Sequence, residues 1–172
     1  MKKYGGRAWI GGVAGALVVA RRTHRSWSTL WESRSLWVNL PTSIHADSPR
    51  SMEQVDQAFG YILHRTKIDA DAKNVAGDAK LLQFDALHGY ARVYVDGDLK
   101  GTIDRRLGQT QLRVAAHGGQ RLDLLVENSG RINFTTKIRG ERAGIVGDVR
   151  LDGRGAARLG DRTAAARSAA DR

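Results

Sequence analysis

The chain has 172 residues, a formal net charge of +10 at pH 7 and no cysteine. It is too short for a complete (β/α)₈ barrel, which takes about 250 residues, and it can form neither disulfides nor thiolate metal sites. The positive charge lies at the two ends, because residues 1–30 contain six basic and no acidic residues and residues 154–172 contain five Arg and two Asp. The centre is therefore close to neutral, which argues against nucleic-acid or membrane partners for the body of the protein.

Residues 1–33 contain an apolar run, 9–20, between two basic clusters, as a secretory signal peptide does. The run is too short to cross a bilayer, which takes about 20 residues. Arg21 and Arg22 follow it directly, where small residues should mark a cleavage site. We predict an unstructured or artefactual leader, and we leave the localisation open because export would require this segment to be a genuine signal.

Residues 34–50 carry the two prolines of the chain, Pro41 and Pro49, which favour an extended linker over a strand or a long helix. Ser51 and Gln54 follow with the spacing of a capping box, which predicts one or two helical turns at the start of the domain.

From residue 59 the chain alternates between apolar and polar residues, which is typical of strands with one buried face. Asp96 and Gly97 form the strongest short-range hairpin signal, and the Asn128 to Gly130 turn is expected to join two further strands. The pattern predicts strands at 59–66, 80–87, 90–95, 99–103, 111–115, 122–126, 131–134 and 145–151. Short strands at this spacing predict an all-β fold, an antiparallel jelly-roll-like β-sandwich over residues 51–153. Residues 154–172 contain one large apolar side chain, Leu159, and are expected to be a disordered tail.

Four blocks of this pattern carry a family resemblance, and they are SMEQVDQAFGYILHRT (51–66), GYARVYVDGDLKGTIDR (89–105), LDLLVENSGRINF (122–134) and GIVGDVRLDG (144–153). Together they resemble the first all-β domain that follows the catalytic barrel in glycoside hydrolase family 35 β-galactosidases. The preceding RSLWVNLP (34–41) is similar to the linker that leaves the barrel in that family.

The resemblance implies that the chain comes from a β-galactosidase, an enzyme that hydrolyses terminal β-D-galactosides, and that it is the non-catalytic accessory domain. The implied partners are the catalytic barrel and the second β domain of the parent enzyme. A retaining glycosidase needs two carboxyl groups about 5 Å apart, and the resemblance places neither in the aligned blocks. We therefore assign no catalytic residue and expect the chain to be inactive alone. Because both ends depart from the family pattern, our hypothesis is a gene fragment whose ends are read out of frame.

A carbohydrate (galactose)-binding module is the alternative function, with a galactoside as ligand and Tyr90, Asn128 and Arg131 as sugar-binding candidates. These residue types occur in sugar sites on β-sandwiches, although the chain is poor in aromatic residues. A nucleic-acid binder that acts through its basic ends is a further alternative. The pair Asp123 and Glu127 is interpreted as forming local turn contacts, because nothing in the sequence buries or pairs it.

The five histidines show no metal-ligand spacing, so we expect no metal site. His64 is interpreted as a half-buried surface residue on its strand. The glycine pairs lack the strand, loop and helix context of a phosphate cradle, and no G-x-S-x-G elbow is present, so we expect neither a cofactor nor a nucleophile.

Overall fold

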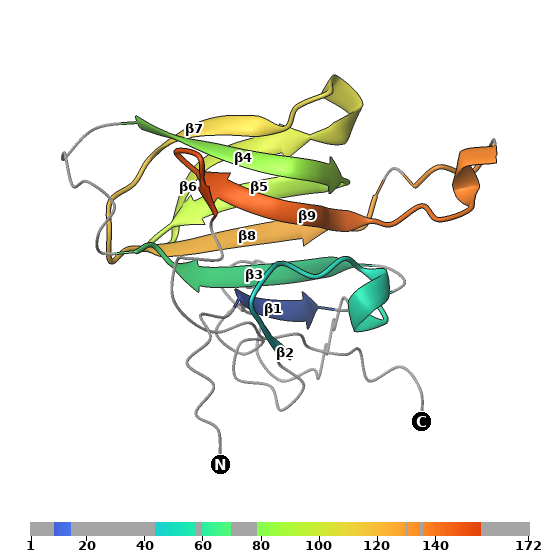
Figure 1. The fold of residues 1–172 in the computed structure, drawn as a ribbon, viewed down its shortest axis with the longest axis horizontal. Coiled ribbons are helices and arrows are strands. Elements are labelled where there is room, and N and C mark those ends of the chain that lie inside the picture. Colours follow the sequence, from blue (N-terminus) through green and yellow to red (C-terminus); the bar gives the residue numbers. More distant parts are fainter. Residues whose placement is uncertain are drawn as a thin grey trace, which may run out of the picture.

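The computed structural model describes residues 9–14, 44–57, 60–69, 79–129, 131–134 and 136–155. They form two antiparallel β-sheets that stack face to face, as Figure 1 shows. The predicted all-β sandwich is therefore confirmed. The predicted tail at 154–172 lies outside the described residues except for its first two positions, which form a short strand.

The larger sheet has six strands, and each pairs antiparallel with its neighbour. Their order across the sheet is β2 (Ile44–Ala46), β1 (Trp9–Ala14), β3 (Tyr61–Lys67), β8 (Arg121–Glu127), β5 (Tyr90–Val95) and β6 (Asp98–Asp104). β8 lies at the centre, since it pairs along its whole length with β3 and over six residues with β5. β8 therefore holds the sheet together.

The smaller sheet has four antiparallel strands. Their order is β10 (Arg154–Gly155), β9 (Gly144–Leu151), β4 (Ala79–His88) and β7 (Gln111–Ala115). Three short 3₁₀ helices lie in the described connections, namely η1 (Glu53–Val55), η2 (Arg105–Leu107) and η3 (Thr136–Ile138).

The hydrophobic core lies between the sheets and follows from the alternation of each strand. In β8, Leu122, Leu124 and Val126 point into the core, where each is fully buried. From the facing sheet, Leu82 and Ile145 pack against the same cluster. Burying one such side chain contributes about 1.5–3 kcal/mol, so this shared core fixes both the pairing register and the stacking of the sheets.

The outer face of the six-stranded sheet holds a second, smaller cluster made by Leu63, Tyr94 and Leu125. Beside it lies Asp123, which is fully buried and accepts two hydrogen bonds from the Arg65 guanidinium, at 2.6 and 3.1 Å. The interpretation of Asp123 as an unburied residue with only local contacts is therefore wrong. Its partner comes from 58 positions earlier in the chain, and the pairing of β3 with β8 brings the two residues opposite each other.

His64 is a second correction, because it is buried completely on the core side of β3 rather than at the surface. Burial lowers the pKa of its imidazole to about 3, so the ring is neutral at physiological pH.

Most predicted strands are present with shifts of one or two residues at their ends, and 90–95 and 111–115 match β5 and β7. The predicted strand at 131–134 is wrong, because these residues lie in the long connection from β8 to β9. Three strands were not predicted, and one of them, β10, lies at the start of the expected disordered tail. β1 lies inside the expected leader, and β2 lies inside the expected linker. β1 pairs with the free edge of β3, and β2 pairs with the outer edge of β1. A local sequence pattern cannot reveal backbone pairing of this kind. The rest of residues 1–43 lies outside the described residues.

Candidate functional site

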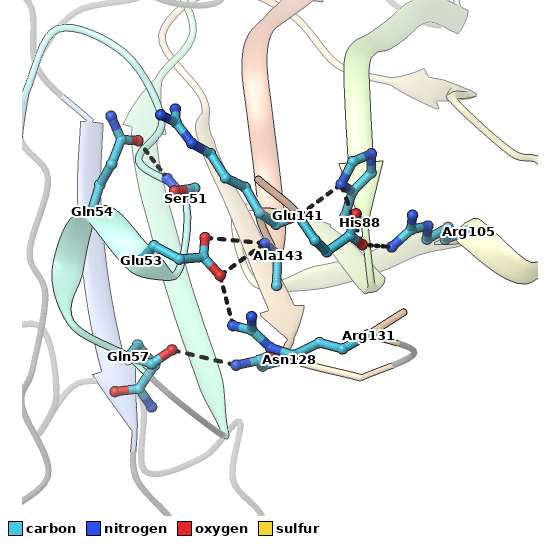
Figure 2. A network of polar contacts seen from close by, with 11 residues as sticks. Ser51, Glu53, Gln54, Gln57, His88, Arg105, Asn128, Arg131, Glu141 and Ala143 are labelled. Atoms are coloured by element: carbon cyan, nitrogen blue, oxygen red, sulfur yellow. Dashed lines mark hydrogen bonds and ion pairs between the residues drawn. The ribbon is translucent and has the colours of Figure 1, made fainter. Parts of the chain in front are cut away.

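The connection between β8 and β9, residues 128–143, projects from one end of the sandwich, as Figure 1 shows. We call residues 131–142 the end loop. Its base is held by a polar network that links it to η1 on one side and to β4 and η2 on the other (Figure 2). The network positions the loop, and so we describe it first.

Glu53 is the centre of the η1 side of this network. Both of its carboxylate oxygens accept the backbone N–H of Ala143, at 3.1 Å each. The same carboxylate pairs with the Arg131 guanidinium at 2.8 Å. One side chain therefore binds both ends of the end loop (Figure 2).

Backbone contacts reinforce this junction. The Met52 N–H donates to the Ala143 carbonyl at 2.9 Å, and Met52 itself is fully buried. The Asn128 amide accepts from Arg131 Nε at 2.8 Å and donates to the Gln57 carbonyl at 3.3 Å. The segment from Ser51 to Gln57 thus lies along the base of the loop.

On the other side of the network, Glu141 pairs with the Arg105 guanidinium at 2.5 Å. Its carboxylate also lies 3.8 Å from His88 Nδ1, and the same ring nitrogen lies 2.7 Å from the Arg142 carbonyl oxygen. His88 ends β4 and Arg105 begins η2, so the loop is fixed to both sheets of the sandwich.

The electrostatics of Glu53 agree with its contacts. Partial burial by itself would raise the pKa of this carboxyl group. Hydrogen bonds from its own N–H, from the Ala143 N–H and from Arg131 outweigh that effect and hold the pKa below its ordinary value of 4.5. Glu53 is therefore ionised at neutral pH, which the ion pair with Arg131 requires.

Beyond this fixed base, the end loop exposes apolar side chains. Phe134 is 82% exposed and Ile138 is 48% exposed. Leu107 in η2, 70% exposed, lies at the same end of the sandwich, because Arg105 in η2 contacts Glu141 of the loop. We call Leu107, Phe134 and Ile138 the apolar end face.

The acidic residues at this end of the sandwich serve as partners for arginines, since Glu53 and Glu141 are each paired with an Arg. Within the described residues, no group of three or more His, Cys, Asp and Glu side chains could hold a metal ion. Nor is there, in that part of the chain, a helix with the length and apolar character needed to cross a membrane.

The structure brings together two of the three sugar-binding candidates. Asn128 and Arg131 lie in contact at the loop base, with their polar groups directed at each other and at η1. Tyr90 starts β5. Its side chain hydrogen bonds with Arg92, and the pKa of Arg92 is raised by hydrogen bonds with Tyr94 and, to a smaller extent, with Tyr90. The structure thus adds a structural role for Asn128 and Arg131 that the sequence did not indicate.

Sequence reasoning missed Glu53 and Glu141, which hold the loop. Only the spacing of Ser51 and Gln54 pointed to this region, and the structure keeps half of that capping box, since the Ser51 N–H donates to Gln54 Oε1 at 2.9 Å. The ion pair of Arg131 with Glu53 was not predicted either.

Comparison with known proteins agrees with this architecture. The family described as "Beta-galactosidase, first all-beta domain" matches residues 49–159. A β-galactosidase of Xanthomonas manihotis is 48% identical over 124 residues, which are 72% of this chain and 20% of that protein. The β-galactosidase of Homo sapiens is 36% identical over 103 residues, 60% of this chain and 15% of that protein. A solved β-glucuronidase of an uncultured Clostridium sp. superposes with a TM-score of 0.48 at 16% identity, covering 85% of this chain and 27% of that chain.

The fold and the family match define the class of protein as an all-β domain associated with glycosidases. The chain belongs to the family of β-galactosidase first all-β domains. It spans a fifth or less of the length of these β-galactosidase relatives.

Proposed function

We propose that this chain is the non-catalytic accessory domain of a β-galactosidase and that its role is structural, packing against the catalytic barrel of the parent enzyme. The observation that carries the proposal is the family match over residues 49–159, which contain every described strand except β1 and β2. The matching segment of the Xanthomonas manihotis β-galactosidase is only 20% of that protein. The parent enzyme would hydrolyse terminal β-D-galactosides, with catalytic carboxyl groups that lie outside this domain.

The ion pairs of the domain support a structural role. Asp123 is bound by Arg65 and Arg121, and Glu53 by Arg131. Paired carboxylates of this kind hold strands and loops together. For Glu53, hydrogen bonds from its own N–H, from the Ala143 N–H and from Arg131 also hold the pKa below its ordinary value, which disfavours the protonated form that a general acid needs.

The first test is a hydrolysis assay on the purified 172-residue chain with a chromogenic β-galactoside. We expect no release of the chromophore above buffer, while a cooperative thermal transition shows that the chain is folded. Hydrolysis by the chain alone would overturn the proposal.

The second test uses the Xanthomonas manihotis enzyme, whose matching segment would be replaced by residues 49–159 of this chain. We expect this chimera to keep β-galactosidase activity, and we expect an enzyme with a Gly/Ser linker at the same place to lose it. An inactive chimera in which the barrel remains folded would contradict the structural role.

Calorimetry with galactose tests the alternative of a carbohydrate-binding module. We expect no saturable heat of binding, because Asn128 and Arg131 already use their polar groups within the domain. Saturable binding that is lost in an Asn128→Ala variant with an unchanged melting temperature would favour the binding module instead.

A further inference from the structure

We propose that the apolar end face, formed by Leu107, Phe134 and Ile138, is the surface through which the domain docks onto the catalytic barrel. We infer that the complementary barrel surface is an apolar hollow edged by acidic side chains. This inference rests on the proposed function and adds to it the contact surface and the chemistry of its partner.

The first argument is the distribution of exposed apolar side chains. Four large hydrophobic residues are exposed in the part of the chain that the structure describes, and three of them form the apolar end face. The fourth, Leu99, lies at the opposite end, because the register of β5 and β6 places Tyr90 opposite Asp104 at one end and Val95 opposite Asp98 at the other. Apolar side chains gathered at one end mark an interaction surface, whereas scattered ones do not.

The second argument is that the exposed tip stands on a fixed base. Glu53 binds both ends of the end loop, and Glu141 ties its far end to η2. A loop that is held in place before binding loses less conformational entropy when it docks. An aromatic side chain such as Phe134 can bury about 150–250 Å² in a partner, which suits it to the role of an anchor.

The third argument is charge. The end loop contains four basic residues, Arg131, Lys137, Arg139 and Arg142, and one acidic residue, Glu141. Arg131 pairs with Glu53 and Glu141 pairs with Arg105, and both of these partners lie outside the loop. The remaining excess of positive charge therefore comes from Lys137, Arg139 and Arg142. An acidic partner surface would be attracted, whereas a second copy of this chain would present the same basic loop and be repelled. Charge therefore favours a different partner over self-association.

The fourth argument is the path of the chain. The family match begins at residue 49, and the segment from Ser51 to Gln57 lies against the base of the end loop, with the Met52 N–H bound to the Ala143 carbonyl. The first residues of the matched domain therefore lie at the end that carries the loop (Figure 2). A domain attached at that point would lie at the same end of the sandwich as the apolar end face.

The basic residues of the loop also provide the test, because trypsin cleaves after Lys and Arg. Lys137 and Arg139 flank Ile138, so a docked loop should be protected from cleavage at these two positions. We would measure the cleavage rate there by mass spectrometry in the free 172-residue chain and in the chimera with the Xanthomonas manihotis enzyme. We expect cleavage in the chimera to be at least about tenfold slower than in the free chain.

Phe134→Asp in the chimera should restore cleavage to near the rate in the free chain, and the matched control Leu99→Asp should leave the protection unchanged. An active chimera whose loop is cut as fast as in the free chain would overturn this inference and leave the accessory role intact. Equal protection in the Phe134→Asp and unmodified chimeras would also overturn it. An inactive chimera would instead count against the proposed function itself.

Sedimentation of the free chain tests the competing occupant, a second copy. We expect a monomer, and we expect cleavage at Lys137 and Arg139 to be independent of chain concentration. A dimer that protects these bonds and dissociates in the Phe134→Asp variant would assign the apolar end face to self-association and overturn the proposal.

Discussion

Replacing Glu53 by Gln should loosen the end loop without unfolding the sandwich. The substitution keeps the size of the side chain and one oxygen acceptor, but it removes the negative charge of the carboxylate. That charge binds Arg131 and also strengthens the hydrogen bond from the Ala143 N–H. A hydrogen bond to a charged group contributes about 1.5–3 kcal/mol when it is buried. The side chain of Glu53 is 35% exposed, so solvent screening reduces this to about 1 kcal/mol.

Native-state hydrogen exchange of the Ala143 amide measures this loss directly. A decrease of about 1 kcal/mol in the free energy of local opening should increase the exchange rate about fivefold. The control is Asp98→Asn, which removes the ion pair with Lys100 at 3.5 Å at the other end of the sandwich, where Asp98 is 80% exposed. The control should leave exchange at Ala143 unchanged. Equal exchange in the Glu53→Gln and unmodified chains would refute the account of the loop base.

The pH dependence of this protection has a definite sign. The folded-state pKa of Glu53 lies below its ordinary value of 4.5, so the contribution of Glu53 is fully present above pH 4.5. It is lost as the pH falls through the folded-state pKa, because protonation removes the charge. Protection of the Ala143 amide, corrected for intrinsic exchange, should therefore fall below about pH 4.5 in the unmodified chain and change less in Glu53→Gln.

Two further predictions concern the sandwich itself. Asp123→Ala should lower the free energy of unfolding by about 3–5 kcal/mol, because it leaves the Arg65 guanidinium, which is only 15% exposed, without its partner. Asp85→Ala removes an exposed ion pair and should lower the free energy of unfolding by no more than about 1 kcal/mol. Equal melting temperatures for these two variants would contradict the reasoning. Gly89→Ala should cost about 3 kcal/mol or more, since φ is +154° and a Cβ would lie 2.5 Å from a backbone carbonyl oxygen of β8. At Gly108, φ is +66° and an added Cβ would have no atom within 4 Å, so Gly108→Ala should lower the free energy of unfolding by only about 1 kcal/mol. Denaturant unfolding that shows a larger loss for Gly108→Ala than for Gly89→Ala would refute the argument.

The strands could be predicted because their signal is local. In β5 and β8, alternate residues face the core, and the spacing of apolar residues within each strand predicts which residues these are. The strand predicted at 131–134 shows where this reasoning ends. Residues 131–134 follow a turn signal that predicts a second strand. Instead, Arg131 forms an ion pair with Glu53, a residue 78 positions earlier in the chain. A contact of this range leaves no periodic trace in either segment.

The same reason explains the errors at Asp123 and His64. A charged residue on a strand is normally exposed, and Asp123 would be exposed as well if it had no arginine partner. It is buried because Arg65 on the neighbouring strand satisfies both of its oxygens, and that pairing depends on the register of β3 with β8. His64 occupies a core position of β3, where burial keeps its ring neutral. Both outcomes are set by strand pairing rather than by the residue types themselves.

The candidate site was the hardest part to predict, because it consists of the apolar and basic side chains that remain exposed after folding. The sandwich buries alternate residues of its strands and pairs Asp123 and Glu53 with arginines. What it does not bury or neutralise is concentrated at one end, in Phe134, Ile138 and the basic residues between Arg131 and Arg142. A sheet fixed in register by a shared core gives that loop a fixed position, and a fixed loop with an apolar tip can be recognised by a complementary surface. We therefore expect the contacts of Glu53 to matter for the position of the loop, and so for the proposed docking, more than for the stability of the sandwich.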